Sequence, residues 1–487
     1  MKPSFYVAIL FSAVSAMAAS WPKAGPNYKP PKATVPGSYH QQAGAAGTNT
    51  DAAIGKWWAT LNDPELTALI DRAVRANLDL KIASSRILEA RASRRVTRAD
   101  LLPTVASSDT VQRVRGGLTS GLFNVNKGSS GRSSLLTPFE SNVFQFGFDA
   151  SWEIDFAGGR RRALEAATAD VAAIAEARRD TLVSLLGEVA RNYSELRGFQ
   201  RRLEITSRNI KLQEDSLELT RVRAEAGLGN QLDVERQAAQ LATTRSQVPS
   251  LEAAEIQTIH RLGVLLGEEP GALLSELTQS KPLPTVPSAV PVGLPADLLK
   301  RRPDVREAEA RVAAETARVG IARADLFPKI LLTGAAGRQA TEPSGLTLGA
   351  GNFFSIGPAI TLPIFNAGKI RGNIEAQKQR LDQALTQYQS TVLRSLEETE
   401  NSLVAYGHEK DRQSKLVAAV EASREATMLA NELYTRGLSD FLSVLDAQRQ
   451  QLAAEDDLAQ SDTAVVTDLI ALYKALGGGW EADRAIR

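Results

Sequence analysis

The sequence predicts a mainly α-helical protein that also carries a transmembrane β-sheet and is built twice on the same plan. The duplication shows in short motifs. Arg98-Ala99-Asp100-Leu101-Leu102-Pro103 returns as Arg323-Ala324-Asp325-Leu326-Phe327-Pro328, and Phe156-Ala157-Gly158-Gly159-Arg160 returns as Phe365-Asn366-Ala367-Gly368-Lys369. A strictly alternating strand pattern and very long unbroken helical patterns are the other two observations. The repeat defines the structural unit as helix, strand pair, very long helix, Gly-Leu turn and helix.

The composition excludes several kinds of functional site. The 57 basic residues nearly balance the 56 acidic ones, so no overall field attracts nucleic acid, and no nucleic-acid partner is expected. The absence of cysteine excludes disulfides, thiolate metal sites, a cysteine nucleophile and a lipidated N-terminal cysteine. His40, His260 and His408 lie far apart without metal-ligand spacing. We therefore expect neither a metal nor a cofactor.

Residues 1–18 are predicted to be a cleavable signal peptide. Lys2 supplies the positive charge, residues 5–13 are mostly apolar, and Ala16-Met17-Ala18 offers small residues for cleavage between Ala18 and Ala19. An uncleaved anchor helix is the alternative. The apolar run is short for that role, because a helix needs roughly 20 apolar residues to cross a bilayer. No later segment of the sequence reaches that length.

Residues 19–60 are predicted to form an extended, Pro-rich segment. Such a segment cannot build a core of its own, so we expect it to lie along another surface of the protein. Asp63 and Pro64 then supply the N-cap and the first position of a helix. The apolar period of this helix continues to about Asp100, and Pro103 ends it.

A strand pattern follows, in which apolar and polar residues alternate strictly from Phe144 to Ile154. The apolar side carries four aromatic residues that we expect to face lipid: Phe144, Phe146, Phe148 and Trp152. A water-soluble sandwich is the alternative. The run favours a membrane strand, because it is longer than a typical globular strand of about 5–6 residues and matches the length of about 10 that crosses a bilayer.

The second half of the chain supplies a matching strand pair. Residues 330–338 form one predicted strand and residues 354–364 the other, and loops over 116–140 and 337–352 close the two hairpins. Open sheet edges are not tolerated in lipid. Four strands are too few for a closed sheet, so the sequence predicts a barrel that closes by oligomerisation.

After each hairpin comes a very long helical pattern. In the first, apolar residues recur every seven positions, as in a coiled-coil seam: Leu182, Val189, Leu196, Leu203, Ile210 and Leu217. The predicted helix spans residues 160–225 and would form a rod of roughly 100 Å at 1.5 Å per residue. Residues 369–435 repeat this design. Each rod ends in a short turn, Gly227-Leu228-Gly229 or Gly437-Leu438-Ser439, and a second helix returns.

These features divide the chain into a first repeat over 61–280 and a second repeat over 297–480. A Pro-rich bridge over 281–296 joins the repeats, and residues 481–487 form a C-terminal tail.

No catalytic constellation is found, so no enzymatic activity is expected. The segments Gly227-Leu228-Gly229-Asn230 and Gly477-Gly478-Gly479 are rich in glycine like phosphate-binding loops. Neither follows a strand, as phosphate-binding chemistry requires. The first is better explained as the tip of a helical hairpin and the second as a helix stop.

Several further motifs indicate a family. They are Gly25-Pro26-Asn27-Tyr28-Lys29-Pro30-Pro31, Trp57-Trp58 with Asp63-Pro64, Leu294-Pro295-Ala296-Asp297-Leu298-Leu299-Lys300-Arg301-Arg302-Pro303-Asp304, Leu445-Asp446-Ala447-Gln448-Arg449 and Leu476-Gly477-Gly478-Gly479-Trp480. With them the chain resembles the TolC/OprM-like outer-membrane factors of the NodT-like branch, over nearly its whole mature length. These proteins are the exit ducts of tripartite RND-type efflux pumps. The resemblance implies a homotrimer that closes a twelve-stranded β-barrel in the Gram-negative outer membrane and a twelve-helix α-barrel in the periplasm, where most of the mass lies.

The resemblance also implies functional positions. Leu442, Asp446 and Arg449 match the closing ring of the OprM-like branch, and their spacing places them on one helix face. An ordinary exposed charge pair is the alternative for the two polar residues. The turns at Gly227-Leu228-Gly229 and Gly437-Leu438-Ser439 are implied to be the tips that dock a periplasmic adaptor, a membrane fusion protein. The alternative is that their glycines only cap helices.

The implied function is a gated passive channel for drugs or other small molecules that a pump and an adaptor deliver, as in multidrug resistance. Type I secretion and metal efflux through the same fold stay open, and a periplasmic coiled-coil adaptor is an alternative of another class. One feature departs from the family. In the lipoprotein branch a lipidated cysteine precedes the Gly-Pro motif, whereas this chain has Trp21, Pro22, Lys23 and Ala24 there. The barrel alone is therefore expected to hold the protein in the membrane.

Overall fold

The computed structural model describes residues 22–33, 35–40, 54–116, 139–287, 290, 295–346 and 351–481. The predicted signal peptide with its junction between Ala18 and Ala19, and the tail after residue 481, lie outside the described residues. Within those ranges, no helix combines the length and the apolar character that a membrane crossing requires.

The chain divides into two compact units. The strand unit comprises residues 1–30, 89–171 and 311–384, and the helical unit comprises residues 31–88, 172–310 and 385–487. Each unit collects segments from both halves of the sequence. Neither compact unit therefore coincides with one of the predicted repeats, 61–280 and 297–480. The repeats describe the order of elements along the sequence only.

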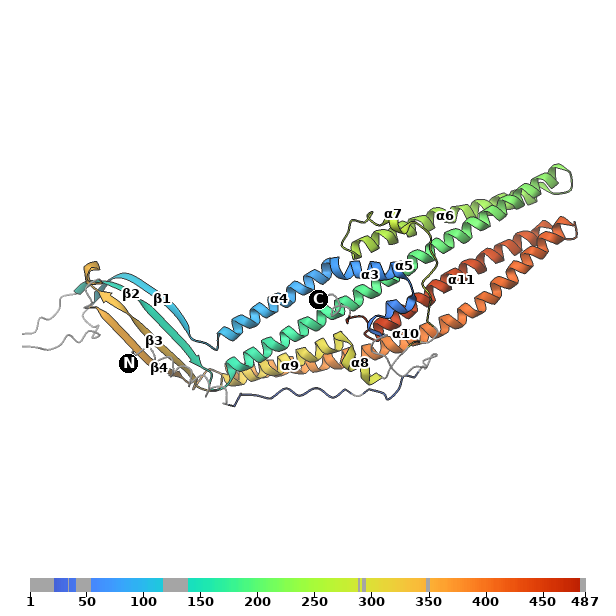
Figure 1. The fold of residues 1–487 in the computed structure, drawn as a ribbon. Helices are drawn as coiled ribbons and strands as arrows, with labels where there is room; N and C mark the ends of the chain where they lie inside the picture. Colours follow the sequence, from blue (N-terminus) through green and yellow to red (C-terminus); the bar gives the residue numbers. More distant parts are fainter. Residues whose placement is uncertain are drawn as a thin grey trace, which may run out of the picture. The chain divides into compact units, whose positions relative to one another are not determined.

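The element order repeats as expected (Figure 1). The first half contains η1 (Trp57–Leu61), α3 (Pro64–Ala76), α4 (Leu78–Ala99), β1 (Thr104–Gly116), β2 (Phe139–Ile154), α5 (Gly159–Glu225), α6 (Gln231–Leu265) and α7 (Leu274–Leu277). The second half contains α8 (Pro295–Arg301), α9 (Pro303–Ala324), β3 (Lys329–Ala340), η2 (Pro343–Leu346), β4 (Asn352–Thr361), α10 (Lys369–Thr435) and α11 (Phe441–Ala475).

The two long helices confirm the predicted rods almost residue for residue. Helix α5 starts one residue before the predicted position, and α10 spans the predicted range 369–435. Asp155 explains the start of α5, because its carboxylate accepts hydrogen bonds from the backbone N–H groups of Arg160 (3.0 Å) and Arg161 (2.9 Å). A carboxylate at this position satisfies donors that have no partner inside the helix.

The predicted helix from Pro64 to about Asp100 is in fact two helices, α3 and α4. Asn77 separates them. Its side-chain oxygen accepts from the N–H of Leu80 at 2.9 Å, and its amide nitrogen donates to the carbonyl of Leu265 at 2.9 Å. One side chain thus caps the start of α4 and ties it to the end of α6. The apolar periodicity continues across Asn77, which is why the sequence did not reveal the break.

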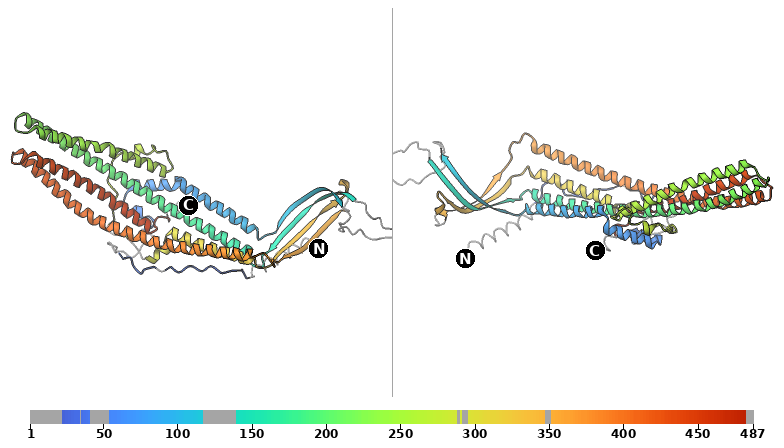
Figure 2. Two further views of the ribbon diagram at one scale, coloured as in Figure 1. Left: turned by 180° about the vertical axis from the view of Figure 1, so that it is seen from behind. Right: turned by 90° about the horizontal axis from the view of Figure 1, so that it is seen from above.

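The four strands of the strand unit form one antiparallel sheet in the order β1-β2-β3-β4. Figure 2 shows the strands side by side from two further directions. The central pair, β2 and β3, joins the two halves of the sequence. Strands β1 and β4 are the edges, so each leaves one row of backbone donors and acceptors without a strand partner within the described chain.

The core of the helical unit joins the Trp57-Trp58 motif, near the start of the sequence, to the Gly-rich motif after α11, near its end. Trp57 stacks on Tyr473 with ring centroids 5.5 Å apart and meets the edge of Trp58 at 5.8 Å. Gly478 passes so close that a Cβ there would lie 2.7 Å from the carbonyl oxygen of Ile54. The Gly-rich segment after α11 is therefore a helix stop that lets the backbone approach the tryptophans.

A buried polar hub holds α3 against α5. The Glu65 carboxylate, at the start of α3, accepts from the Tyr193 hydroxyl at 3.0 Å and pairs with Lys281 at 3.0 Å. It also pairs with the fully buried guanidinium of Arg197. Burial raises the pKa of Glu65, but the hydrogen bonds from Lys281 and Tyr193 and the Arg197 charge outweigh it and hold this pKa below its usual range.

Candidate functional site

The two turns between the long helices are built alike. After α5, the N–H of Leu228 donates to the carbonyl of Arg223 at 2.8 Å, and after α10 the N–H of Leu438 donates to the carbonyl of Leu433 at 2.8 Å. Gly227 and Gly437 occupy the left-handed region at φ +72° and +73°. This is the glycine-dependent helix stop in which the chain closes back on the last turn.

At each turn a polar residue then forms the N-cap of the next helix. The side chain of Asn230 accepts from the N–H of Leu232 at 3.0 Å, and that of Asp440 accepts from the N–H of Ser443 at 3.2 Å. The hydrogen bonds from Ser443 hold the pKa of Asp440 below its usual range. Both turns therefore have a defined backbone, and their shape follows from local sequence.

Each turn exposes one large apolar residue, a leucine. Leu228 is 72% exposed and Leu438 is 71% exposed, and each follows the glycine that ends the long helix. A Cβ at Gly227 or Gly437 would meet no atom within 4 Å. We call Gly227-Leu228-Gly229 and Gly437-Leu438-Ser439 the tips. Helix capping alone explains the glycines but leaves the matched exposed leucines without a structural role.

The two tips are tied to each other. Arg223, in the last turn of α5, donates to the carbonyls of Tyr434 (3.1 Å) and Thr435 (3.2 Å), which end α10. Its guanidinium also lies over the Tyr434 ring, 4.7 Å from the centroid. A cation at the carbonyl end of a helix is stabilised by the helix dipole, and an aromatic face adds a cation–π attraction.

The three predicted gate residues lie on the first turns of α11. Leu442 is half exposed, and Asp446 and Arg449 are exposed as well. The latter two do not pair with each other. Nε of Arg449 donates to Oε1 of Gln240 on α6 at 2.6 Å, and Oδ2 of Asp446 accepts from Nε2 of Gln450 at 2.9 Å. We call α5 with α6 the first helical hairpin and α10 with α11 the second. Arg449 thus connects the second helical hairpin to the first.

Within each hairpin the helices pack through apolar side chains. Figure 1 shows α5 beside α6 and α10 beside α11. In the first hairpin Leu217 packs with Val234 and Leu241, continuing the predicted seven-residue seam. In the second, Tyr434 meets Phe441 with ring centroids 5.3 Å apart in a cluster with Val444 and Leu445.

Residues 182–196 of α5 share one apolar core with α10 and α11. Nearer the tips, the contacts between the two helical hairpins are mostly polar. Four residues of α5 lie at seven-residue steps, one position before the apolar seam, and each bonds to α10 or α11: Arg202, Asn209, Ser216 and Arg223. We call them the polar seam. Ile205, which packs with Leu452 and Ala459, is an apolar exception.

The partners of the polar seam are equally polar. Arg202 pairs with Asp456 at 2.6 Å, Asn209 donates to Glu455 at 3.3 Å, and the hydroxyl of Ser216 accepts from Gln448 at 2.7 Å. We did not predict this series from the sequence, although its period of seven could have revealed it. Polar contacts exchange readily with water and contribute about 1 kcal/mol each, so the hairpins are held together more weakly near the tips than at the apolar core.

One face of the sheet is apolar and open. In the antiparallel register, Phe148 lies opposite Ser107 on β1 and Ala336 on β3, and Ala336 lies opposite Phe354 on β4. The exposed large apolar residues of the strands all belong to this face, apart from Leu331: Val105, Val111, Phe146, Phe148, Phe354, Ile356 and Ile360. The opposite face carries Gln145, Asp149 and Gln339 among mostly small or polar residues.

One of the four predicted lipid-facing aromatics is placed differently from the prediction. Phe144 is half buried but lies on the same face as Phe146 and Phe148, opposite Val111 on β1. Trp152 is only 6% exposed, and its indole N–H donates to the carbonyl of Leu101 at 3.0 Å. The connection from α4 to β1 covers the ring, so the prediction of Trp152 as a lipid-facing residue is wrong. Phe146 and Phe148 are exposed as expected.

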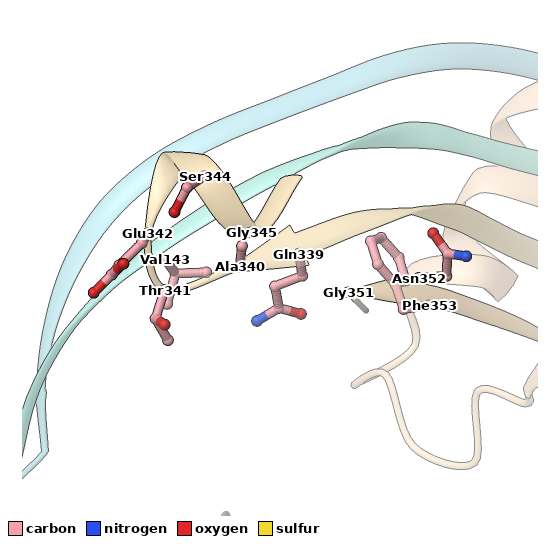
Figure 3. A pocket seen from close by; sticks show the side chains of 10 residues that line it. All are labelled: Val143, Gln339, Ala340, Thr341, Glu342, Ser344, Gly345, Gly351, Asn352 and Phe353. Carbon is pink, nitrogen blue, oxygen red and sulfur yellow. The ribbon is translucent and has the colours of Figure 1, made fainter. Parts of the chain in front are cut away.

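Two cavities lie among the described residues. One of about 550 Å³ lies at the turn from β3 to β4 and is lined by Gln339, Thr341, Glu342, Asn352 and Phe353 with smaller neighbours (Figure 3). Glu342 is the one titratable group in its lining. No group of three or more His, Cys, Asp or Glu residues in the described ranges could hold a metal ion.

A second cavity, of about 340 Å³, lies in the helical unit and is lined by charged residues that include Asp180, Arg302, Asp304, Glu398 and Lys474. Arg302 is buried and pairs with Asp304 and with Glu398, each at 2.7 Å. Burial raises the pKa of Asp180 to about 6, and the charge of Asp304 adds to this shift.

Known proteins similar to this chain share nearly its whole length. A family model described as Outer membrane efflux protein matches residues 69–268 and 294–478. Nodulation protein T of Rhizobium leguminosarum bv. trifolii is 31% identical over 463 residues, which cover 94% of each chain. The solvent efflux pump outer membrane protein SrpC of Pseudomonas putida is 32% identical over 468 residues, 94% of this chain and 96% of SrpC. The solved structure of the outer-membrane channel OprN is 36% identical with a TM-score of 0.86, over 94% of this chain and 99% of OprN.

Proposed function

This chain belongs to the outer membrane efflux protein family, and we propose that three copies form one duct that docks an adaptor through the tips and closes beside Leu442. It is an outer-membrane channel through which an efflux system discharges its cargo. Its fold combines the α-barrel and β-barrel architecture of such channels. The family consists of channels rather than enzymes.

The observation that carries the trimeric duct is the open sheet. Four strands with one apolar, exposed face and two free edges cannot stay as a single copy in lipid, because every edge group there would lack a hydrogen-bond partner. Joining β4 of one copy to β1 of the next removes the edges. Three copies give twelve strands, which is within the range of membrane barrels.

Mass measurement of the purified protein in detergent tests this assembly. We expect one species with three copies and no free monomer. A water-soluble monomer that keeps its helical content would contradict the proposal, since its apolar sheet face would then be stable in water.

The tips are the proposed docking surface for a periplasmic adaptor that works with an inner-membrane pump. Two matched turns, each with a leucine more than two-thirds exposed, present the same small apolar feature twice per copy. Exposed apolar residues grouped in this way are typical of protein interfaces. The adaptor is expected to be helical at the contact, because helical hairpin tips leave only short turns to bind.

The absence of cysteine makes a direct test of docking available. Leu228→Cys and Leu438→Cys each introduce one thiol, which can carry a photo-crosslinker in cells. We expect crosslinks to the adaptor from both tips and none from Lys211→Cys, an exposed position on α5 away from the tip. Equal yields from all three positions would show that the tips are not the docking surface.

The gate is proposed to open by separation along the polar seam. Each hairpin holds itself together by apolar packing, whereas near the tips Arg449 with Gln240 and Arg223 with Tyr434 and Thr435 join one hairpin to the other. Breaking these links moves the second hairpin as a unit and carries Leu442 away from the channel axis. The three copies around the axis would couple the links of one ring.

The proposed cargo is small and organic. SrpC is a solvent efflux protein and another relative exports pyoverdine, so channels of this family serve unlike cargo. Type I secretion and metal efflux use the same fold and stay as alternatives for the cargo. A periplasmic adaptor is disfavoured, because such a protein lacks the long aromatic strands β2 and β4.

A further inference from the structure

The four connections between sheet and helices in the strand unit share one feature. Each carries a cation and a bulky apolar residue four positions apart, with the apolar residue on the strand side. We call these eight residues the collar: Arg98 with Leu102, Phe156 with Arg160, Arg323 with Phe327, and Phe365 with Lys369. The pattern occurs twice in each half of the sequence, so it belongs to the duplicated plan.

The connections hold their apolar residues in the open. Phe365 is 89% exposed and its neighbour Ile364 is 93% exposed. Leu102 and Phe327 are exposed too, and their backbones match, because their N–H groups donate to the carbonyls of Ala99 (2.9 Å) and Ala324 (3.0 Å). Bulky apolar side chains exposed at four equivalent places mark a surface that meets something other than water.

The collar continues the apolar face of the sheet. Leu101, beside Leu102, covers Trp152 on that face and accepts its indole hydrogen bond. On β4 the same face ends at Ile360, shortly before Ile364 and Phe365. The exposed apolar residues of the sheet face are therefore followed directly by the exposed apolar residues of the collar.

The collar carries excess positive charge. Its segments, residues 98–103, 153–162, 323–329 and 365–371, hold eight basic and four acidic residues. The acids have partners: Arg160 pairs with Glu153 (2.7 Å) and Asp100 (3.7 Å).

The remaining two acids are also paired. Arg161 pairs with Asp155 at 3.1 Å, and Lys329 pairs with Asp325 at 2.9 Å. Four exposed cations of these segments are left without an ion pair in the described part of the chain, namely Arg98, Arg323, Lys369 and Arg371, and the first three belong to the collar.

We propose that the collar is a binding surface for anionic phospholipid headgroups in the periplasmic leaflet of the membrane that the sheet crosses. The apolar residues lie at the boundary of the acyl chains, and Arg98, Arg323 and Lys369 extend to the phosphates. Long cationic side chains reach the headgroup level from an apolar surface in this way, and charge-assisted hydrogen bonds to phosphate are strong.

The proposal rests on the membrane location of the channel, and native mass spectrometry of the whole trimer tests it. Phosphatidylglycerol and phosphatidylethanolamine are titrated onto the wild type and onto the triple variant Arg98→Gln, Arg323→Gln, Lys369→Gln. Each cation near an anionic surface contributes a factor of about five in affinity. We expect phosphatidylglycerol binding to fall by about that factor for each cation removed, with phosphatidylethanolamine binding unchanged.

The control variant carries the same loss of charge elsewhere: Lys211→Gln, Arg394→Gln and Lys415→Gln, all exposed positions in the helical unit. It should bind phosphatidylglycerol like the wild type. Phe365→Ser should weaken both lipids, because it removes the apolar half of the collar. The single variants are measured as well, so that a triple variant that fails to assemble does not decide the question.

Several outcomes would overturn the proposal. They are wild-type phosphatidylglycerol binding in the triple variant, an equal loss in the control, displacement of the lipid by millimolar inorganic phosphate, and a preference for lipopolysaccharide over phosphatidylglycerol. The trimer mass is read in the same spectra. A monomer would count against the proposed assembly, whereas an intact trimer without lipid preference counts against the collar alone.

Discussion

Arg223 donates to the carbonyl of Tyr434 at 3.1 Å and stacks its guanidinium on the same residue's ring at 4.7 Å. One side chain of the first hairpin thus holds both the backbone end and the aromatic ring of the second. Arg202 forms a two-bond ion pair with Asp456 farther from the tips, and the other members of the polar seam make single hydrogen bonds. Arg223 is therefore the most strongly engaged link between the hairpins near the tips.

Arg223→Gln should release that link. The hydrogen bonds and the stacking together contribute about 1–2 kcal/mol, so the open form should gain severalfold or more in population. Reconstituted trimers of the variant should conduct more in planar bilayers than the wild type. Arg223→Lys should give an intermediate value, because lysine keeps the charge but cannot stack a planar group. Unchanged conductance in both variants would remove Arg223 from the gate.

Leu228→Asp combined with Leu438→Asp should abolish efflux while trimers still reach the outer membrane. Each aspartate places a charge where an apolar contact with the adaptor is expected, and the helix stops themselves depend on Gly227 and Gly437 rather than on the leucines. Drug susceptibility of cells and trimer content of outer-membrane fractions measure the two effects. Gln247→Asp, at an exposed position of α6, is the matched control, and normal efflux in the tip variant would exclude the tips from docking.

Leu442→Ala combined with Arg449→Ala should raise the conductance of reconstituted trimers and admit large antibiotics to cells. The first change removes the proposed apolar plug, and the second removes the bond to Gln240. Gln240→Ala alone should reproduce part of the increase, since it breaks the same bond from the other side. Conductance at the wild-type level in the double variant would show that this ring is not the gate.

Phe148→Arg should block assembly in the membrane. A cation on the lipid face near the middle of the bilayer costs about 2–4 kcal/mol, and Phe148 lies between Ser107 and Ala336, which cannot pair with it. Phe146→Arg should block assembly as well, because Asp109 lies opposite it on β1 but Arg338 lies opposite it on β3. Heat-resistant trimers in outer-membrane fractions report assembly, and equal amounts in both variants and the wild type would place this face away from lipid.

Asp180→Asn should stabilise the protein at neutral pH. Burial raises the pKa of Asp180 to about 6 from its ordinary 3.8, so the folded state binds this proton more tightly than the unfolded state. Stability therefore falls as pH rises from about 4 to 6 and stays lower above pH 6. Asp304 and Glu307 strengthen the shift, and Arg302 and Lys474 oppose it.

The gain expected from Asp180→Asn at pH 7.5 is about 1–2 kcal/mol, after allowance for solvent screening. Thermal melting of the trimer in detergent at pH 5 and 7.5 measures it, and the difference between wild type and variant should shrink at pH 5. Asp457→Asn, at an exposed position of α11, should change neither value. An equal effect of Asp180→Asn at both pH values would contradict a raised pKa for this carboxyl.

The sequence predicted the elements whose causes are local. The ends of α5 and α10 were found because glycines and caps act within a few residues, and the strands were found because alternation has a period of two. The same reasoning identified the tips and the exposed aromatics Phe146 and Phe148. The family followed from motifs that lie far apart but have fixed neighbours along the chain.

Only the tertiary structure decided the features that depend on distant partners. Asn77 breaks a helix with the help of a carbonyl at Leu265, Trp152 is buried by the connection at Leu101, and the polar seam of α5 has meaning only beside α11. Periodicity records which face of an element avoids water, and it does not record what covers that face. Contacts between residues remote in sequence decide which side chains are covered. The alternating pattern therefore placed Trp152 on the face of Phe148 correctly but could not show that the chain at Leu101 buries it.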